Sequence, residues 1–393
     1  MKIAFFVQWM LCGGVENALI TLTGKLIEMG NEVSVYVIHE KGEFLFSLSE
    51  KVNVKPIPMP EQIRKNIPVG GTTVTVRECM KNREYVRAVY FVLKHKLGKE
   101  KFAELNVNKK RIPILDEKYD IAVNYHMHSP FLVWYLSERV IAKKKYTWVH
   151  NDFSTTGYSI ELLKQYLECN ASFYCVSKQL KDELEERLPE YKGQIYIARN
   201  IVNQSRIIEQ AEEYYPTEYM EMQNSKIKLL TVGRLEERKG YDLAIEVGSR
   251  LASQGIDFHW FILGDGTLRD HLMDMVRDKK LDKKFSFLGV KNNPYPYFKN
   301  CDIYVQTSRH EGFVTTVTEA KILKCPIVCT DVSGAREQIR DGETGDICEI
   351  SVEGIYEKLS RLIQNADIRK QYHTNLIQEK QEAENSWLRI FET

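Results

Sequence analysis

Short β-type runs alternate with longer helical patterns along this chain, and the alternation occurs in two separate series. The chain opens with an apolar run at 2–8, a helix expected from the Gly13-Gly14 turn to about Met29, and a second apolar run at 32–38. Such a βαβ opening implies parallel strands with helices on the faces of the sheet. Further runs follow at 120–125, 145–149, 172–176 and 194–198, and a second series at 227–232, 258–263, 285–288, 303–306 and 326–329. The pattern predicts an α/β protein with two doubly wound, Rossmann-like domains that face each other across a cleft.

The length of 393 residues is sufficient for two such domains. A polar, helical stretch at about 203–224 separates the two series, so we place an N-terminal domain at 1–202 and a C-terminal domain at 203–370. The remaining segment, 371–393, is helical and charged, and its aromatic residues predict that it packs back toward the N-terminal domain. The alternation of strand-like and helical runs is less regular between about 40 and 111.

Composition excludes several functional classes. The formal net charge of +1 does not favour a nucleic-acid partner. No apolar run approaches the roughly 18 residues that a membrane helix needs, and the first residues lack the features of a signal peptide. The eight cysteines form no CxxC pair, which indicates reduced thiols in a cytosolic protein rather than a zinc site. We therefore predict a cytoplasmic protein that binds no metal and contacts membranes only peripherally.

The Gly13-Gly14 pair lies between the first strand and the first helix. Glycines there allow a backbone to approach a ligand closely, and the free N–H groups of a helix start attract anions. The pair does not form a GxGxxG fingerprint, so a nicotinamide cofactor is not indicated. A plain turn between strand and helix is the alternative interpretation.

Two cations flank the loop that follows the strand 227–232. Arg234 and Lys239 would lie at the carboxyl end of that strand, where they could neutralise a pyrophosphate whose charge grows as it leaves. The alternative is a solvated basic loop.

Glu311 and Glu319 are separated by eight positions, with Gly312 between them. We expect a helix to begin near Val314 or Thr315, so that Glu311 precedes the helix and Glu319 lies about one turn inside it. The N–H groups at the helix start form a natural seat for a phosphate, and a carboxylate can accept hydrogen bonds from two neighbouring hydroxyls. Taken alone, the two glutamates could equally be a charge at a helix end and a surface residue.

Four motifs occur in a fixed order along the chain. They are Gly13-Gly-Val-Glu16, Val232-Gly-Arg-Leu235 with Lys239-Gly240, Leu263-Gly-Asp-Gly266, and Ser308-x-x-Glu-Gly-Phe313 with Glu319-Ala320. Together they resemble the retaining glycosyltransferases of family four, the group 1 glycosyl transferases of bacterial cell-surface polysaccharide synthesis, which have the two-domain GT-B fold. The resemblance covers nearly the whole chain, and the C-terminal motifs are its most specific part.

The resemblance implies a role for each matched position. The donor is a nucleotide-diphosphate sugar, with uridine as the expected base, held by the C-terminal domain, and the N-terminal domain binds the acceptor. No cofactor is needed beyond the donor itself. Arg234 and Lys239 would bind the diphosphate, and Glu319 the ribose hydroxyls. The other implied donor contacts are Glu311, Gly312, Phe313 and Val314 to the sugar, Thr315 and Thr316 to phosphate, Val290 to the base, and Gly13 and Gly14 to the donor phosphate and acceptor.

His150 follows the strand 145–149, and similar enzymes often have a histidine there, near the reacting sugar. His126 and His128 are rival candidates, but no carboxylate cluster accompanies them to form a metal site. The resemblance thus implies His150, Glu311, Arg234 and Lys239 as the residues that carry catalysis. It also implies retention at the anomeric carbon without a metal, and we favour front-face attack because no carboxylate is clearly placed as a nucleophile.

The segment 77–111 is strongly basic, with eleven Lys or Arg residues and four Glu. Its apolar residues Tyr85, Val86, Val89, Tyr90, Leu93 and Leu97 have the spacing of one helical face. A basic amphipathic helix can lie on an anionic membrane, which would bring a lipid-linked acceptor within reach. The alternative is an ordinary helix whose apolar face packs on the N-terminal domain.

The sequence therefore predicts transfer of a hexose or N-acetylhexosamine to a glycan acceptor, expected to be lipid-linked. Two other functions remain open: a GT-B enzyme that acts on a soluble sugar or sugar phosphate, and a catalytically silent protein that binds sugar nucleotides.

Overall fold

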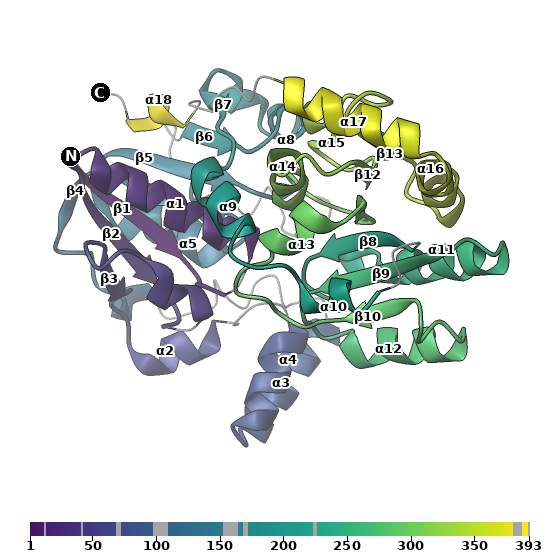
Figure 1. The fold of residues 1–393 in the computed structure, drawn as a ribbon. Helices are drawn as coiled ribbons and strands as arrows, with labels where there is room; N and C mark the ends of the chain where they lie inside the picture. Colours follow the sequence, from purple (N-terminus) through teal and green to yellow (C-terminus); the bar gives the residue numbers. More distant parts are fainter. Residues whose placement is uncertain are drawn as a thin grey trace. The chain divides into compact units, whose positions relative to one another are not determined.

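A computed structural model describes the chain except for residues 12, 41, 68–71, 97–108, 152–163, 168–171, 223–225, 380–386 and 392–393. The chain divides into two compact units (Figure 1). Unit 1 comprises Met1–Val176, Leu180–Arg199 and Ser386–Thr393, and unit 2 comprises Ser177–Gln179 and Asn200–Asn385. The expected third segment, 371–393, is thus divided between the two units.

Unit 1 is built on a seven-stranded sheet in the order β3-β2-β1-β4-β5-β6-β7, in which all neighbouring strands are parallel. The strands are β1 (Lys2–Val7), β2 (Glu32–Val37), β3 (Asn53–Pro56), β4 (Lys118–Asn124), β5 (Ile141–Val149), β6 (Ser172–Cys175) and β7 (Ile195–Ile197). The helices are α1 (Gly14–Glu28), α2 (Glu61–Asn66), α3 (Thr72–Lys81), α4 (Tyr85–Lys96), α5 (Pro130–Arg139), α8 (Lys178–Arg187) and α18 (Leu388–Phe391), with 3₁₀ turns at Glu43–Ser47, Lys109–Arg111 and Pro189–Gln194.

Unit 2 has a six-stranded parallel sheet in the order β10-β9-β8-β11-β12-β13. Its strands are β8 (Ile227–Val232), β9 (Phe258–Leu263), β10 (Phe285–Phe287), β11 (Ile303–Gln306), β12 (Ile327–Thr330) and β13 (Gly345–Cys348). Its helices are α9 (Gln204–Ala211), α10 (Thr217–Met220), α11 (Tyr241–Ser253), α12 (Arg269–Asp278), α13 (Tyr295–Asn300), α14 (Thr315–Ile322), α15 (Ala335–Gln338), α16 (Val352–Gln364) and α17 (Ala366–Gln378), with a 3₁₀ turn at Glu237–Lys239.

Successive side chains of the central strands of unit 2 are buried in two separate hydrophobic cores. Leu229 and Trp260 face one cluster, which contains residues of α11, α12 and α16, while Leu230 and Phe261 face the other, which contains residues of α9, α13 and α14. Successive side chains of a strand point to opposite faces, so a sheet covered on both faces needs continuous apolar runs. This explains why the strands read as unbroken apolar runs in the sequence.

The structure shows which helices lie in the basic segment 77–111. Its described part contains the end of α3 and all of α4, and the two helices pack together through Cys79, Ala88 and Phe91. On the predicted apolar face of α4, Val86 is 87% and Val89 56% exposed. Leu97 lies outside the described residues.

In each sheet the strand order reverses direction at one point, between β1 and β4 in unit 1 and between β8 and β11 in unit 2. In open parallel sheets, loops on either side of such a point diverge and leave a crevice at the carboxyl ends of the strands. The predicted site residues are therefore expected in the loops after these strands.

Candidate functional site

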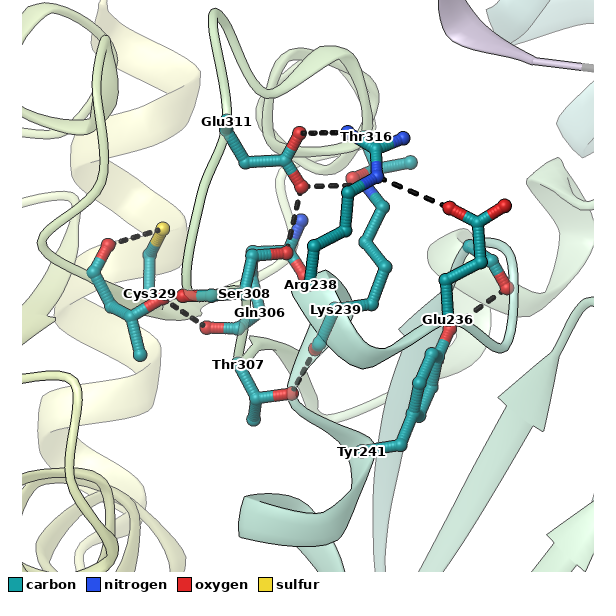
Figure 2. Close-up of polar contacts among 12 residues, drawn as sticks. Glu236, Arg238, Lys239, Tyr241, Gln306, Thr307, Ser308, Glu311, Thr316 and Cys329 are labelled. Atoms are coloured by element: carbon teal, nitrogen blue, oxygen red, sulfur yellow. Dashed lines mark hydrogen bonds and ion pairs between the residues drawn. The ribbon is translucent and has the colours of Figure 1, made fainter. Parts of the chain in front are cut away.

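The predicted cations Arg234 and Lys239 come from the loop after β8. Glu311 comes from the loop after the adjacent strand β11. Lys239 Nζ lies 2.5 Å from Glu311 Oε1, and Ser308 Oγ donates to the same oxygen at 2.7 Å. Figure 2 shows these side chains meeting at Glu311. The structure thus joins two residues that the sequence assigned to different ends of a ligand.

Arg238 also reaches this carboxylate, with its Nη1 atom 4.0 Å from Glu311 Oε2. Glu236 bridges two cations, since Arg238 Nε lies 3.2 Å and Arg234 Nη1 3.4 Å from its two carboxylate oxygens. Three cations therefore share two carboxylates, which leaves one positive charge in excess. The sequence assigned no role to Arg238, Glu236 or Ser308. Ser308 opens one of the quoted motifs, whereas Arg238 and Glu236 were marked only by their position within two residues of predicted ones.

Glu311 is buried, with 8% of the residue exposed. Burial by itself raises the pKa of its carboxyl, but Lys239 and Arg238 outweigh this effect and hold the pKa below its usual value. A buried carboxylate is tolerated only when it is paired and hydrogen-bonded. Glu311 is thus a stable anion in the free protein, and its partners are groups that a ligand could replace.

The loop that follows β8 carries these cations, and close contacts of its backbone with the loop after β11 hold it in place. Gly240 has a φ of +64°, and a Cβ atom there would lie 2.1 Å from the carbonyl oxygen of Thr307. The Thr307 hydroxyl in turn donates to the backbone oxygen of Lys239 at 2.9 Å. These contacts fix the loop after β8 against the loop after β11.

Helix α14 begins at Thr315, as expected, and Val314 precedes it as the N-cap with no side-chain hydrogen bond to the helix start. The Thr316 hydroxyl accepts a hydrogen bond from Tyr304 at 2.6 Å. Gly312 and Phe313 pack against Gly334, where a Cβ atom would lie 2.9 Å from the Phe313 ring. The backbone at the start of α14 is therefore held in place while its N–H groups lack a side-chain cap.

Glu319 lies inside α14 and is 8% exposed. The Tyr295 hydroxyl donates to its Oε1 atom at 3.4 Å. Burial raises the pKa of Glu319 to about 7, although the tyrosine opposes the shift. Val290, the predicted base contact, is 58% exposed and follows Gly289, whose backbone oxygen accepts from Gly264 N–H at 2.8 Å.

In unit 1 the predicted residues follow β1, β4 and β5, which are neighbours in the sheet. Gly13 caps α1, and Gly14 is its first residue. His150 is buried against Tyr125, with ring centroids 4.4 Å apart. Burial, with a smaller contribution from His128, lowers the pKa of His150 to about 3. Among the described residues neither ring nitrogen of His150 has a hydrogen-bond partner.

The rival histidines have partners within the protein. His126 Nδ1 accepts from the Gln8 backbone N–H at 3.1 Å, and its Nε2 lies 3.8 Å from Glu16. His128 Nε2 contacts the Gln8 side chain at 3.0 Å. No group of three or more potential metal ligands occurs among the residues that the structure describes. His150 therefore differs from its rivals in having no hydrogen-bond partner among the residues that the structure describes.

Two doubly wound parallel sheets, each with its candidate residues at the carboxyl ends of the strands, define the GT-B class of fold. Residues 220–379 match the family described as glycosyl transferases group 1. The matched segment lies in unit 2 and agrees with the resemblance drawn from the motifs.

Known relatives agree with this assignment. The chain is 36% identical over 146 residues to the N-acetylgalactosamine-N,N'-diacetylbacillosaminyl-diphospho-undecaprenol 4-alpha-N-acetylgalactosaminyltransferase of Campylobacter jejuni, a match that covers 37% of this chain and 39% of the relative. Matches to the first curated relatives span about two fifths of their length. An uncharacterized glycosyltransferase of Haemophilus influenzae is 24% identical over 93% of this chain and 92% of its own. S. aureus TarM, solved with fondaparinux, alpha-GlcNAc-glycerol and UDP, shares the fold with a TM-score of 0.68 at 14% identity, over 100% of both chains.

Proposed function

We propose that this protein is a retaining, metal-independent glycosyltransferase. It moves a hexose or N-acetylhexosamine from a UDP-sugar to a lipid-linked glycan in cell-surface polysaccharide synthesis. The observation that carries the proposal is the ion pair of Lys239 and Glu311 beside the uncapped start of α14, at the point where the strand order of unit 2 reverses. A cation cluster, a helix start and a buried carboxylate are the groups that a diphosphate joined to a sugar requires.

When the donor binds, it replaces contacts that the residues of this cluster make with one another. Sugar hydroxyls donate to Glu311 in place of Lys239, which releases the ammonium group toward the diphosphate. Arg234 and Arg238, which are held by Glu236, add positive charge on the same side. The cations then face the oxygen on which charge develops as the glycosidic bond breaks, where preorganised charge contributes most to the rate.

The nucleoside end of the donor lies with Glu319, whose carboxylate accepts hydrogen bonds from the two ribose hydroxyls. The backbone beside Val290 contacts the base. Uridine is favoured because S. aureus TarM, which shares the fold, was solved with UDP.

Within unit 1, His150 is suited to bind a hydroxyl group. Because its pKa is about 3, the ring is neutral at physiological pH and carries one donor and one acceptor nitrogen. A hydroxyl group matches that pair, whereas an ionised phosphate only accepts hydrogen bonds and would leave the acceptor nitrogen unpaired. A buried polar group without a partner is disfavoured by about 1–3 kcal/mol, which a hydroxyl would recover.

The reaction proceeds on one face of the sugar. The bond from the anomeric carbon to the diphosphate oxygen breaks, the bond to the acceptor oxygen forms, and the acceptor proton passes to the leaving phosphate oxygen. Glu311 holds hydroxyls of the sugar and does not attack it. The lipid-linked acceptor is inferred from the Campylobacter relative, whose name contains a diphospho-undecaprenol acceptor.

The exposed face of α4 would bring the enzyme to that acceptor. Tyr85, Val86, Val89, Tyr90 and Leu93 are each more than 40% exposed, and Arg77, Lys81 and Arg83 are exposed nearby. Apolar side chains with flanking cations suit an anionic lipid surface. No described helix is both long and apolar enough to cross a bilayer.

Liposome pelleting tests the membrane part. The full chain should sediment with vesicles that contain anionic lipid at low salt, and a Val86→Asp/Val89→Asp variant should not. Ile377→Asp is the matched control, because Ile377 is 58% exposed on α17 of unit 2. Equal sedimentation of all three proteins would contradict the proposed membrane face.

A transfer assay tests the activity. The full chain is incubated with UDP-sugars and either a lipid-linked glycan or soluble sugars and sugar phosphates, with EDTA present. UDP release that requires the lipid-linked acceptor supports the proposal, and Lys239→Ala and Glu311→Ala should lower the rate by at least about 100-fold. UDP release with soluble acceptors alone would favour the enzyme that acts on soluble sugars or sugar phosphates. Binding of the UDP-sugar without turnover would favour the catalytically silent binding protein.

A further inference from the structure

Two thiols of unit 2 lie in direct contact. Cys301 Sγ and Cys325 Sγ are 3.1 Å apart, about 1 Å more than the ~2.05 Å of a disulfide bond. Their other sulfur contacts are weak, with Cys301 Sγ 3.3 Å from the oxygen of Phe298 and Cys325 Sγ 3.5 Å from that of Pro326. Each sulfur therefore has the other as its nearest reactive neighbour among these contacts.

The backbone fixes this proximity. Cys301 is the C-cap of α13 and precedes β11, and Cys325 follows α14 and precedes β12. The two strands are paired in parallel, with Tyr304 opposite Ile327, so the cysteines meet at the amino ends of adjacent strands. Cys325 is held further by its N–H, which donates to the Ala320 oxygen at 2.9 Å.

The two thiols differ in access. Cys301 is partly exposed, whereas Cys325 is only 3% exposed. Burial, together with the neighbouring Cys325, raises the pKa of the Cys301 thiol well above its usual value. Because the thiolate is the reactive form, we expect Cys301 to react slowly and Cys325 to respond only through Cys301.

We propose that Cys301 and Cys325 form an oxidation site, at which a peroxide converts the pair into an intramolecular disulfide that ties α13 to α14. Cys301 sulfur attacks the peroxide, which forms a sulfenic acid and releases one water. Cys325 sulfur then displaces the hydroxyl of the sulfenic acid and releases a second water. Two thiols are oxidised, one peroxide is reduced, and a dithiol reagent reverses the change.

The cross-link would act on a pair of helices that already contact each other. Tyr295, at the start of α13, donates to Glu319 in α14. A bond between the far ends of these helices restricts their separation and shortens the free chain of the unfolded state. This inference does not depend on the proposed function, because it concerns only the thiol pair and the stability of unit 2.

Peptide mapping of the oxidised full chain tests the site. The native protein is treated with hydrogen peroxide, alkylated, and digested without reductant, and a peptide pair linked through Cys301 and Cys325 should appear and disappear with dithiothreitol. The thermal midpoint of unit 2 should rise by roughly 5 °C or more, reversibly. Cys325→Ser should lose both effects, while Cys348→Ser, which removes another buried thiol of unit 2, should keep them.

The proposal is overturned if the oxidised wild-type protein contains Cys301 as an alkylatable thiol or a sulfonic acid with no linked Cys325. That peptide map uses no variant, so it decides the question even if Cys325→Ser does not fold. A reversible rise in the midpoint that persists in Cys325→Ser would also overturn it.

Discussion

At the residue scale, Glu311 shows how one buried carboxylate depends on groups distant in sequence. It is held by Lys239, 72 positions earlier, and by Ser308, three positions earlier. The motifs pointed to both Glu311 and Lys239, but their contact could not be predicted, since it requires β8 and β11 to be adjacent in the sheet. Arg238 was missed because nothing in a run of charged residues distinguishes the side chain that turns inward.

Replacing Glu311 by Gln should destabilise the protein even without a ligand. Lys239 is 14% exposed and would lose the carboxylate that compensates its burial, at a cost of about 3 kcal/mol. The free energy of unfolding in urea measures the effect. Glu353→Gln is the control, since Glu353 forms an exposed pair with Arg250 and should change stability much less than Glu311→Gln. Equal losses in both variants would mean that the pair at Glu311 has no special role.

Glu319 should make stability depend on pH. Its folded pKa of about 7 exceeds the ordinary 4.5, so the folded state binds the proton more tightly than the unfolded state. The stabilising contribution of the protonated group is complete below about pH 4.5 and is lost as pH rises to about 7. The Glu319→Gln variant has no carboxyl group at this position and therefore does not lose this contribution as the pH rises. The free energy of unfolding of the variant, relative to that of the wild type, should increase by about 2–3 kcal/mol between pH 5 and 8. A difference between the two proteins that stays constant with pH would contradict the assignment.

At the scale of elements, the sequence predicted strands best where both faces of the sheet are covered. The runs at 227–232, 258–263 and 303–306 appear as β8, β9 and β11 with the predicted bounds. Strands β3 and β13 were missed, for different reasons. All four residues of the edge strand β3 are at least partly exposed, so no apolar run marks it. In β13 the buried Asp346 interrupts the pattern, and its compensating partner Arg361 comes from α16.

The loops at the carboxyl ends of β8 and β9 contact each other through backbone atoms. Gly264 has a φ of +137°, and a Cβ atom there would lie 1.9 Å from the Gly233 oxygen. Gly264→Ala should therefore destabilise unit 2 by about 3 kcal/mol or more, because the loop beside Arg234 must move. Gly255→Ala is the matched control, since its φ is +71° but nothing lies within 4 Å, and about 1 kcal/mol is expected. Chemical denaturation measures the free energy of unfolding of both variants. If both lose a similar amount, the close contact between the two loops does not contribute to stability.

At the scale of the whole molecule, the chain forms unit 1, apart from Ser177–Gln179, then unit 2, and its last residues return to unit 1. Helix α17 belongs to unit 2, where Tyr372 is part of the core. Helix α18 belongs to unit 1, where Phe391 lies 6.2 Å from Phe5 between ring centroids. The charged pattern of 371–393 indicated a helical segment but not its division between the two units.

Calorimetric titration of the full chain with UDP, GDP and ADP tests the central claim, that the cluster of Lys239 and Glu311 in unit 2 receives a nucleotide-diphosphate donor. UDP should bind with a Kd below about 1 mM, and Lys239→Ala should weaken it by at least about 10-fold, or 1.4 kcal/mol. If none of the three nucleotides binds, or if Lys239→Ala binds UDP as tightly as the wild type, the proposed donor site is wrong.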